Sequence, residues 1–301
     1  MAWTDSVDED RIVRIRELVS SATAADGTAP VSEDAVRGLT ATTGVVHRVD
    51  LDAAGNVAGY AQKRLGHGDH PDMSEVVVAP ESRGRGIGTD LVSDALAQGG
   101  KGAQVWAHGD LPAAQSVARK LGLVGARELL QLRRPLTAPD LPEVTVPEGI
   151  SLRTYEGPGD DAEILRVNAA AFSWHPEQGA MSAADFEQSR GEAWFDPAGL
   201  FLAFADDEPQ TILGFHWTKV HPAEVGSEAI GEVYVVGISP EAQGRGLGRV
   251  LTLAGLHHLR KLQLSAVMLY VEGDNSAALH TYERLGFERF HVDLAYSYPE
   301  N

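Results

Sequence analysis

Two segments of the chain have a residue pattern that can bind an anion without a metal. Residues 83–88 and 243–248 both read Arg/Gln-Gly-Arg-Gly-x-Gly, and each follows a β-branched run and precedes an apolar helical run. Glycines let the backbone turn its N–H groups inward at a helix N-terminus, where unpaired donors and the positive end of the helix dipole attract phosphate. A plain glycine-rich turn is the alternative for one isolated copy. Two copies in matching context favour a pyrophosphate site.

Other catalytic loop patterns do not fit. The chain contains no Gly-x-x-x-x-Gly-Lys-Ser/Thr run, and the spacing Gly-x-Gly-x-Gly differs from the Gly-x-Gly-x-x-Gly of dinucleotide-binding folds. The chain also contains no Gly-x-Ser-x-Gly run, which is the pattern that indicates a serine hydrolase. An NTPase, a dehydrogenase and a serine hydrolase are therefore disfavoured.

The elements that must position the two loops recur in the same order in both halves. Each half is expected to open with a helix, followed by a short helix capped by Ser32 or Ser182. An antiparallel hairpin comes next and leads to the strand before the loop. The expected hairpin strands are residues 45–51 and 57–64 in the first half and 200–205 and 211–220 in the second.

The spacing between the halves indicates a duplicated domain. Arg83 and Gln243 are 160 residues apart, and the Leu-Gly pairs at 121–122 and 285–286 are 164 residues apart. Offsets this close predict one domain of about 150 residues used twice. Residues 133–149 carry four prolines, which disfavour helix interiors and central strands. We therefore expect an N-terminal domain over 1–138, a linker over 139–149 and a C-terminal domain over 150–301.

Composition excludes several classes of protein. The chain has 301 residues, 43% hydrophobic, a formal net charge of −18 and no cysteine. Such a charge repels phosphate backbones and anionic lipid, so neither nucleic acid nor membrane is an expected partner. Without cysteine there is no disulfide, no thiolate nucleophile and no Cys-ligated zinc. The N-terminus lacks an apolar signal core and no run is long enough to span a membrane, which favours the cytoplasm, although an oxidising compartment stays open.

The loops, together with residues 275–287, resemble the two diagnostic motifs of the GNAT acetyltransferase superfamily. The resemblance implies an α/β (α+β) fold of two tandem GNAT-like domains, each a mixed, largely antiparallel sheet flanked by helices. It further implies a sheet splayed at the strand before the loop, and acetyl-CoA as acetyl donor with its pyrophosphate on the loop amides.

The tandem arrangement is similar to one branch of that superfamily, the mycothiol synthase family, over nearly the whole chain. The segments that carry this likeness are 25–31, 106–109, 175–179, 190–197 and 214–222. It implies direct acetyl transfer, in a ternary complex, to the cysteinyl amine of cysteinyl-glucosaminyl-inositol, the last step of mycothiol synthesis in actinobacteria. The absence of cysteine also excludes transfer through an enzyme thiol.

Thioester aminolysis needs a base for the ammonium proton and a group that stabilises the departing thiolate. An α-amine of pKa about 7.7–8.0 needs only a modest base, which Glu232 could supply directly or through water. Tyr282 suits the second role through a strong hydrogen bond or by protonation. The alternatives are a solvated carboxylate at a strand start and an amphipathic core tyrosine. The resemblance places Glu232 and Tyr282 on the family's catalytic glutamate and tyrosine.

The resemblance also assigns binding residues. Acceptor contacts fall on Glu33, Glu177, Lys219, Glu232 and Tyr270. In the second half, acetyl-CoA contacts fall on Val236, Gly237, Ile238, Gln243, Gly244, Arg245, Gly246, Leu247, Gly248, Arg249, Asn275, Ser276, Ala277, Ala278, Leu279 and His280. In the first half they fall on Val76, Val77, Val78, Gly84, Arg85, Gly86, Ile87, Gly88 and Thr89.

The two halves differ at the catalytic positions. Aligning the two Leu-Gly pairs places Ala118 opposite Tyr282 and Leu111 opposite Asn275, so the first half lacks both polar groups. We expect the C-terminal half to catalyse and the N-terminal half to be non-catalytic, with acetyl-CoA binding there left open.

The remaining expectations are a monomer, a small-molecule acceptor and no metal, since no histidine group has a ligand spacing that supports one. Two other functions stay open at this stage. One is acetylation of another amine, such as an aminoglycoside or a peptide N-terminus. The other is a non-catalytic acetyl-CoA sensor, which would require neither Glu232 nor Tyr282.

Overall fold

The computed structural model describes residues 2–41, 43–66, 70–173, 178–223 and 228–299. The chain forms two compact units: unit 1 comprises Met1–Leu129 and His291–Asn301, and unit 2 comprises Leu130–Phe290. Residues 130–138 thus fall in unit 2 and residues 291–301 in unit 1, each in the other unit from the one that the sequence led us to expect. The physical reason is that the strands at the end of each half extend into the other unit.

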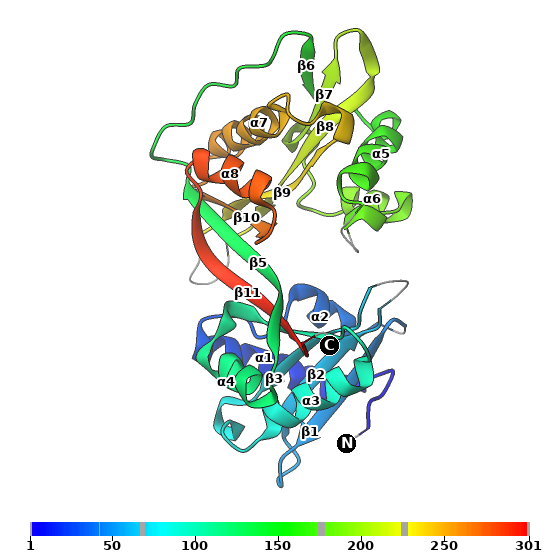
Figure 1. Cartoon of the computed structure of the whole chain (residues 1–301), viewed down its shortest axis with the longest axis vertical. Helices are drawn as coiled ribbons and strands as arrows, with labels where there is room; N and C mark the ends of the chain where they lie inside the picture. The colour runs from blue at the N-terminus through cyan, green and yellow to red at the C-terminus, as the bar shows by residue number, and fades with distance from the viewer. Residues whose placement is uncertain (1, 42, 67–69, 174–177, 224–227, 300–301) are drawn as a thin grey trace. The chain divides into compact units, whose positions relative to one another are not determined.

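Unit 1 is a sheet with helices on both faces (Figure 1). Its strand order is β1-β2-β3-β4-β11; β3 and β4 run parallel, whereas the pairs β1–β2, β2–β3 and β4–β11 are antiparallel. The elements are α1 (Glu9–Asp26), α2 (Glu33–Gly38), β1 (Val45–Leu51), β2 (Val57–Arg64), β3 (Met73–Val78), η1 (Pro80–Ser82), α3 (Ile87–Gly99), β4 (Gln104–Ala107), η2 (His108–Asp110), α4 (Pro112–Leu121), the start of β5 (Val124–Pro135) and most of β11 (Glu288–Ser297).

Unit 2 has the same plan, with α5 and α6 on one face of its sheet and α7 and α8 on the other (Figure 1). Its strand order is β5-β10-β9-β8-β7-β6, with β9 and β10 parallel. The elements are the end of β5, β6 (Ile150–Thr154), η3 (Pro158–Asp160), α5 (Asp161–Ala171), η4 (Gln178–Ala180), α6 (Ala183–Arg190), η5 (Pro197–Gly199), β7 (Leu200–Ala205), β8 (Glu208–His221), β9 (Ile230–Ile238), η6 (Pro240–Ala242), α7 (Leu247–Lys261), β10 (Ala266–Glu272), α8 (Ser276–Arg284) and the start of β11.

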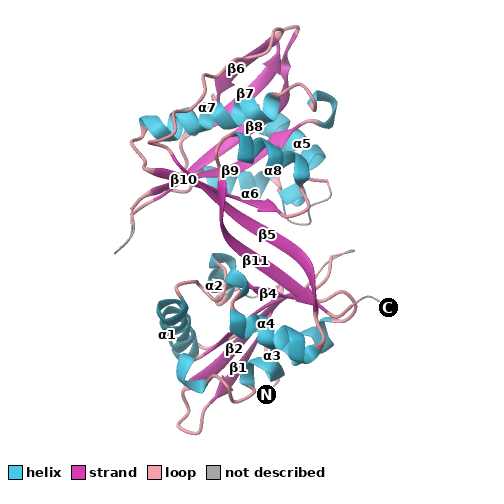
Figure 2. Ribbon diagram, turned by 60° about the vertical axis from the view of Figure 1, so that its left-hand side comes forward, coloured by secondary structure: helices cyan, strands magenta, loops and turns pink. Residues whose placement is uncertain are grey.

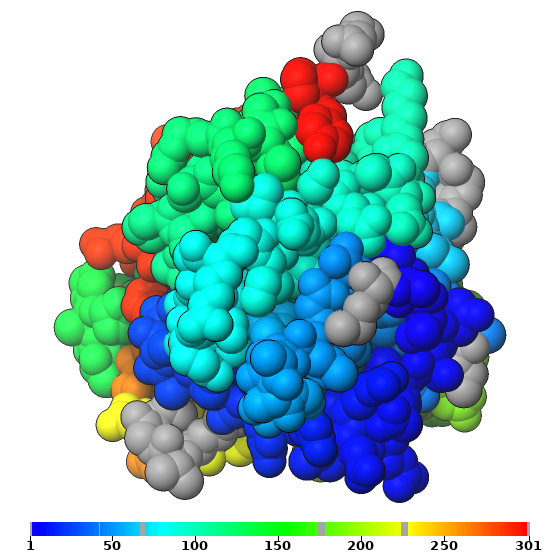
Figure 3. All heavy atoms as spheres, turned by 90° about the horizontal axis from the view of Figure 1, so that it is seen from below, coloured from blue at the N-terminus to red at the C-terminus, as the bar shows by residue number. Residues whose placement is uncertain are grey.

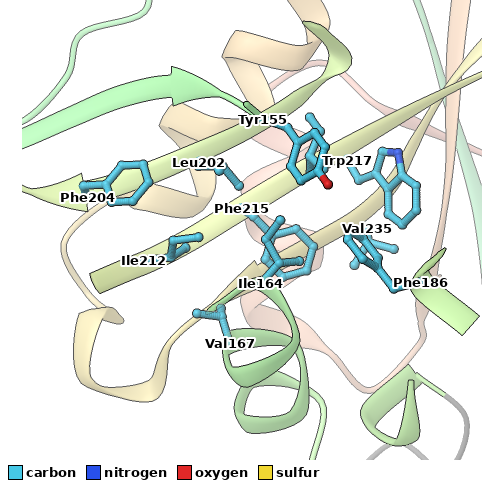
Figure 4. Packing of buried hydrophobic residues seen from close by; sticks show 11 residues of the cluster. Tyr155, Ile164, Val167, Phe186, Leu202, Phe204, Ile212, Phe215, Trp217 and Val235 are labelled. Atoms are coloured by element: carbon cyan, nitrogen blue, oxygen red, sulfur yellow. The ribbon is translucent and has the colours of Figure 1, made fainter. Parts of the chain in front are cut away.

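Each unit buries its own core. In unit 1, α1 and α2 pack Ile15, Leu18 and Ala35 against Tyr60 and Val77 of the sheet. In unit 2, an aromatic cluster fills the space between α5, α6 and the sheet (Figure 4); its members include Tyr155, Ile164, Val167, Phe186, Leu202, Phe204, Ile212, Phe215, Trp217 and Val235. Because burying one large apolar side chain stabilises a fold by about 1.5–3 kcal/mol, this cluster makes a rigid base for the strands that carry the loop.

The local sequence signals located most elements. Ser32 and Ser182 cap α2 and α6 as predicted, and Ser182 forms a reciprocal capping box with Asp185. The strands at 45–51, 57–64 and 200–205 have the predicted bounds. The second strand of the later hairpin is longer than predicted, because β8 starts at Glu208 and ends at His221.

The proline-rich stretch, residues 133–149, is irregular except at its start. Its first residues, 133–135, are the last residues of β5, and irregular backbone begins after them. Proline disfavours a strand interior, but Pro135 is the terminal residue of its strand and so removes little pairing.

The end of the chain belongs to unit 1 through pairing of β11 with β4, which joins Leu294 to Ala107 and Tyr296 to Val105. The magenta ribbons of Figure 2 show how long β5 and β11 are, and in Figure 3 the red end of β11 lies among cyan and green atoms of unit 1. No helix in the described ranges is both long and apolar enough to cross a membrane.

Candidate active site

Two parallel strands of unit 2 separate at the position of the predicted base. Their pairing joins Val267 to Gly231 and Met268 to Glu232, and it ends there although β9 continues to Ile238. Unit 1 repeats this feature, because β3 and β4 pair only as far as Glu75. The strands therefore diverge before each glycine loop, as the sequence led us to expect.

The loop after β9 leads into α7 with its backbone exposed. Gly246 is the N-cap residue of α7 and has a φ of 79°, in the left-handed region that favours glycine. Apart from the adjoining residues of the loop and the helix's own backbone, no heavy atom of the described residues lies within 4 Å of where a side chain on Gly244, Gly246 or Gly248 would begin. The N–H groups of the first turn have no acceptor inside the helix, and the positive end of its dipole lies there. This arrangement fits a pyrophosphate.

The other predicted donor-binding residues lie on adjoining elements. The end of β9 contains residues 236–238, the loop and first turn of α7 contain 243–249, and α8 begins at Ser276. Asn275 is the N-cap residue of α8, and its Oδ1 accepts a hydrogen bond from the N–H of Ala278 at 3.1 Å. Asn275 therefore has a structural role at this helix start.

Glu232 lies at the last position of β9 that pairs with β10, and its side chain is only 9% exposed. His221 Nε2 on β8 lies 2.7 Å from Glu232 Oε2, so the ring N–H donates to the carboxylate. Lys219 is the direct partner of Glu232 across the β8–β9 ladder. A buried carboxylate with a hydrogen-bonded imidazole is a chemically suitable proton acceptor.

Tyr282 lies in the last turn of α8, and its ring packs edge-on against Phe287 with 5.6 Å between centroids. Desolvation of the phenol raises the pKa of Tyr282 to about 12. A free thiol has a pKa of about 8.5, so complete proton transfer from this phenol to a thiolate is unfavourable by roughly three to four orders of magnitude. The structure therefore favours Tyr282 as a hydrogen-bond donor over Tyr282 as an acid.

Unit 1 contains a second copy of the loop with the same backbone. Gly86 is the N-cap residue of α3 with a φ of 91°, and residues 76–78 and 84–89 occupy the positions of 236–238 and 244–249. The Ser82 N–H donates to Ala79 as the Ala242 N–H donates to Ser239, each at 2.8–2.9 Å. The first residue of the loop differs between the units, being Arg83 in unit 1 and Gln243 in unit 2. Arg83 forms a bidentate ion pair with Asp26 at 2.7 and 2.8 Å.

The sequence profile of the acetyltransferase (GNAT) family matches the chain twice, at residues 14–123 and 164–287. The chain belongs to the GNAT acetyltransferase family. The double match confirms the predicted duplication, and the fold of each unit confirms the predicted class of fold. The protein is an acyltransferase.

Individual relatives agree with this assignment. The chain is 61% identical to the mycothiol acetyltransferases of Rhodococcus jostii and Rhodococcus opacus, in both cases over 298 residues that cover 98% of this chain and 97% of the relative. It resembles the fold of a GCN5-related N-acetyltransferase from Sphaerobacter thermophilus with a TM-score of 0.70 and 20% identity, covering 98% of this chain and 94% of that one.

The residues predicted to contact the acceptor are spread over both units of this GNAT protein. In unit 2, the Lys219 ammonium lies 5.1 Å from the centroid of Trp194 and 5.4 Å from that of Tyr234. Tyr270 accepts a hydrogen bond from Gln131. In unit 1, Glu33 is exposed at the start of α2. Glu177 lies outside the described residues.

The first GNAT unit has apolar residues where the second has polar ones. Leu111 starts α4 without a side-chain cap, where Asn275 caps α8. The N–H of Leu123 donates to the carbonyl of Ala118 at 2.9 Å, and the N–H of Phe287 donates to that of Tyr282 at 3.0 Å. This shared backbone bond shows that the sequence alignment of Ala118 with Tyr282 is structurally sound.

The carboxylate at the splay of unit 1 lies in a partly buried network that sequence reasoning missed. Glu75 accepts hydrogen bonds from the backbone N–H and the Oγ of Ser32, and His108 Nε2 lies 2.9 Å from it. His108 Nδ1 lies 3.3 Å from Asp293. Burial alone would lower the pKa of His108, but its bonds to Asp293 and Glu75 outweigh burial and raise the pKa to about 9.

His221 was also missed, and a sequence signal for it existed. Lys219 lies in the predicted strand 211–220 and His221 follows directly after it, so the two share one face if the strand is extended by one residue, and Glu232 begins the next predicted strand. Cross-strand pairing of these residues could have been tested against the apolar pattern. Among the described residues there is no group of His, Asp and Glu arranged to hold a metal ion.

Proposed function

We propose that the protein is an acetyl-CoA-dependent mycothiol acetyltransferase and that unit 2 performs the reaction. The acceptor is the cysteinyl amine of cysteinyl-glucosaminyl-inositol. Identity of 61% to two mycothiol acetyltransferases over almost the full length supports the assignment. The observation that carries the catalytic part is the placement of Glu232 at the splay of β9 and β10, on the strand that leads into the loop.

Residues of the loop and the start of α7 hold the donor. The exposed N–H groups at Gly246 and in the following turn bind the pyrophosphate, and the diverging strands leave the edge of β9 free to receive the acyl arm. Local backbone dipoles attract the anionic donor although the protein as a whole carries a net charge of −18. The same geometry in unit 1 supports a second acetyl-CoA site there.

Glu232 accepts the proton of the ammonium group, directly or through one water. The neutral amine then attacks the thioester carbonyl and the new N–C bond forms. The C–S bond breaks with its electron pair leaving on sulfur, and the nitrogen releases its second proton to solvent, which leaves a neutral amide and a CoA thiolate that takes a proton from solvent. The Tyr282 O–H donates a hydrogen bond to that sulfur as negative charge develops. His221 positions Glu232 by holding one carboxylate oxygen at 2.7 Å.

A single assay separates this function from its alternatives. The protein is incubated with acetyl-CoA and cysteinyl-glucosaminyl-inositol while free CoA thiol is measured, and the product is identified by mass. We expect stoichiometric thiol release and one acetyl group on the amine. Release only with another amine would identify a different N-acetyltransferase, and binding of acetyl-CoA without release to any acceptor would identify a sensor.

A further inference from the structure

A row of side chains crosses the sheet of unit 2 from Glu232 toward β11. Met268 pairs with Glu232, so both side chains point to the same face of the sheet. Tyr270 follows two residues later on β10 and points to that face as well. Gln131 of β5 reaches both, with its Nε2 3.6 Å from Met268 Sδ and 2.6 Å from the Tyr270 hydroxyl.

The row continues with two more residues that are fixed to the first. Arg133 Nε donates to Gln131 Oε1 at 3.1 Å, and the Arg133 guanidinium lies 3.5 Å from the centroid of the Phe290 ring. We call Gln131, Arg133, Tyr270 and Phe290 the platform. Its members hold one another through two hydrogen bonds and one stacking contact, so it is preorganised.

Two members of the platform are large aromatic side chains that remain in contact with solvent. Tyr270 is 45% exposed and Phe290 is 57% exposed. The apolar C–H face of a ring sugar or cyclitol packs well on an aromatic ring, whose face carries partial negative charge. The Arg133 guanidinium and the Tyr270 hydroxyl, which accepts a hydrogen bond from Gln131, are the polar groups beside the rings that can hydrogen-bond ring hydroxyls.

The distance from the predicted base fits a ligand of two rings. Neighbouring strands lie about 4.8 Å apart, so the three steps from β9 across β10 and β5 to β11 span roughly 14 Å. An acceptor whose amine lies at Glu232 reaches Phe290 only if it extends well beyond the amino acid.

We propose that the platform is the subsite for the polyhydroxylated rings of the acceptor and that Phe290 and Arg133 determine specificity for them. This inference rests on the proposed function and deepens it. Interactions with rings remote from the amine contribute binding energy, so they separate this acceptor from other cysteinyl amines.

The test compares two acceptors that share one amine. Cysteinyl-glucosaminyl-inositol carries the rings and cysteinamide lacks them. For Phe290→Ala and Arg133→Met we expect kcat/KM for the ring-bearing acceptor to fall roughly 10- to 100-fold, mainly through KM. The value for cysteinamide should stay within about twofold of wild type. Phe290→Tyr keeps the ring and should restore most of the loss.

A control variant and a direct binding measurement complete the test. Tyr298→Ala removes an equally exposed aromatic side chain (45%) outside the platform and should change neither acceptor. Equal losses with both acceptors, or no loss with either, would overturn the platform. Wild type that fails to acetylate the ring-bearing acceptor would overturn the proposed function instead. Calorimetry with free glucosaminyl-inositol judges the platform independently of turnover, because equal affinity in wild type and Phe290→Ala contradicts it.

Discussion

Unit 1 and unit 2 share a backbone around the glycine loop but differ in the polar groups beside it. Both loops have a left-handed glycine at the helix start, and both follow a strand that diverges from its parallel neighbour. In unit 1, Glu75 is held by Ser32 and His108. Glu232 of unit 2 is held by His221 on a neighbouring strand.

The same contrast holds on the helix after the next strand. Unit 1 has Leu111 and Ala118 where unit 2 has Asn275 and Tyr282. Both copies therefore have the glycine and helix geometry that we propose to bind an anion through backbone atoms. The side chains that we propose to take part in the reaction are present in unit 2 and replaced in unit 1.

The largest expected difference concerns the glycine loops. Gly246→Asp places a carboxylate beside the proposed pyrophosphate site at a φ of 79°, and we expect turnover to be abolished. Gly86→Asp should leave kcat within about threefold and reduce donor occupancy or stability. Gly246→Asn, similar in size and able to adopt the left-handed region, serves as the control for strain. Equal loss of kcat at positions 86 and 246 would contradict an asymmetric pair of units.

The next difference concerns the two carboxylates. Glu232→Gln should lower kcat by roughly 10²- to 10⁴-fold, the usual contribution of a positioned base. Glu75→Gln should leave kcat nearly unchanged and destabilise unit 1, because Glu75 accepts hydrogen bonds from Ser32 and His108. Steady-state kinetics and thermal unfolding of both variants decide the matter. A large fall in kcat for Glu75→Gln would place chemistry in unit 1.

Tyr282→Phe keeps the contact with Phe287 and removes only the hydroxyl. We expect kcat to fall by about 10²-fold with little change in the affinity for acetyl-CoA. Because burial raises the pKa of Tyr282 to about 12, the wild-type pH profile should show no loss of activity from this group below about pH 10. A falling limb near pH 9 that disappears in Tyr282→Phe would show that the tyrosine acts as an acid.

The smallest expected effect is a pH dependence of stability that differs between the units. The pKa of His108 is about 9 in the folded state and about 6.5 when unfolded, so its stabilisation is complete below pH 6.5 and is lost as pH rises through 9. The loss amounts to about 3 kcal/mol. Burial lowers the pKa of His216 in unit 2 to about 4, so unit 2 instead loses stability as pH falls from 6.5 to 4.

Hydrogen exchange resolved by peptide can follow both units in one sample. Peptides of β3 and β4 should lose protection between pH 6.5 and 9, and His108→Gln should remove that loss. Burial also lowers the pKa of His47 in unit 1, so both units lose stability at acidic pH. Only the loss of stability at alkaline pH therefore distinguishes unit 1 from unit 2. Unchanged protection of β3 in wild type across this range would contradict the role of the network.

Much of the site could be predicted from the sequence because its signals are local. The glycine spacing, the serine caps and the hairpins each depend on residues within one turn or one strand, and the two copies reinforced each other. His221 and the network of Glu75, His108 and Asp293 could not be found this way. Their partners lie 11 to 185 positions apart in the chain and meet only through strand pairing.

By itself, the sequence determined that this protein is one GNAT domain used twice, and it predicts that the second copy carries the catalytic residues. Only the tertiary structure decided that the last strand belongs to unit 1, that Glu232 is bound by His221, and that the platform faces the same side as Glu232. The physical reason is that residue type and spacing fix local backbone geometry, whereas strand neighbours and buried ion pairs depend on which distant segments pack together.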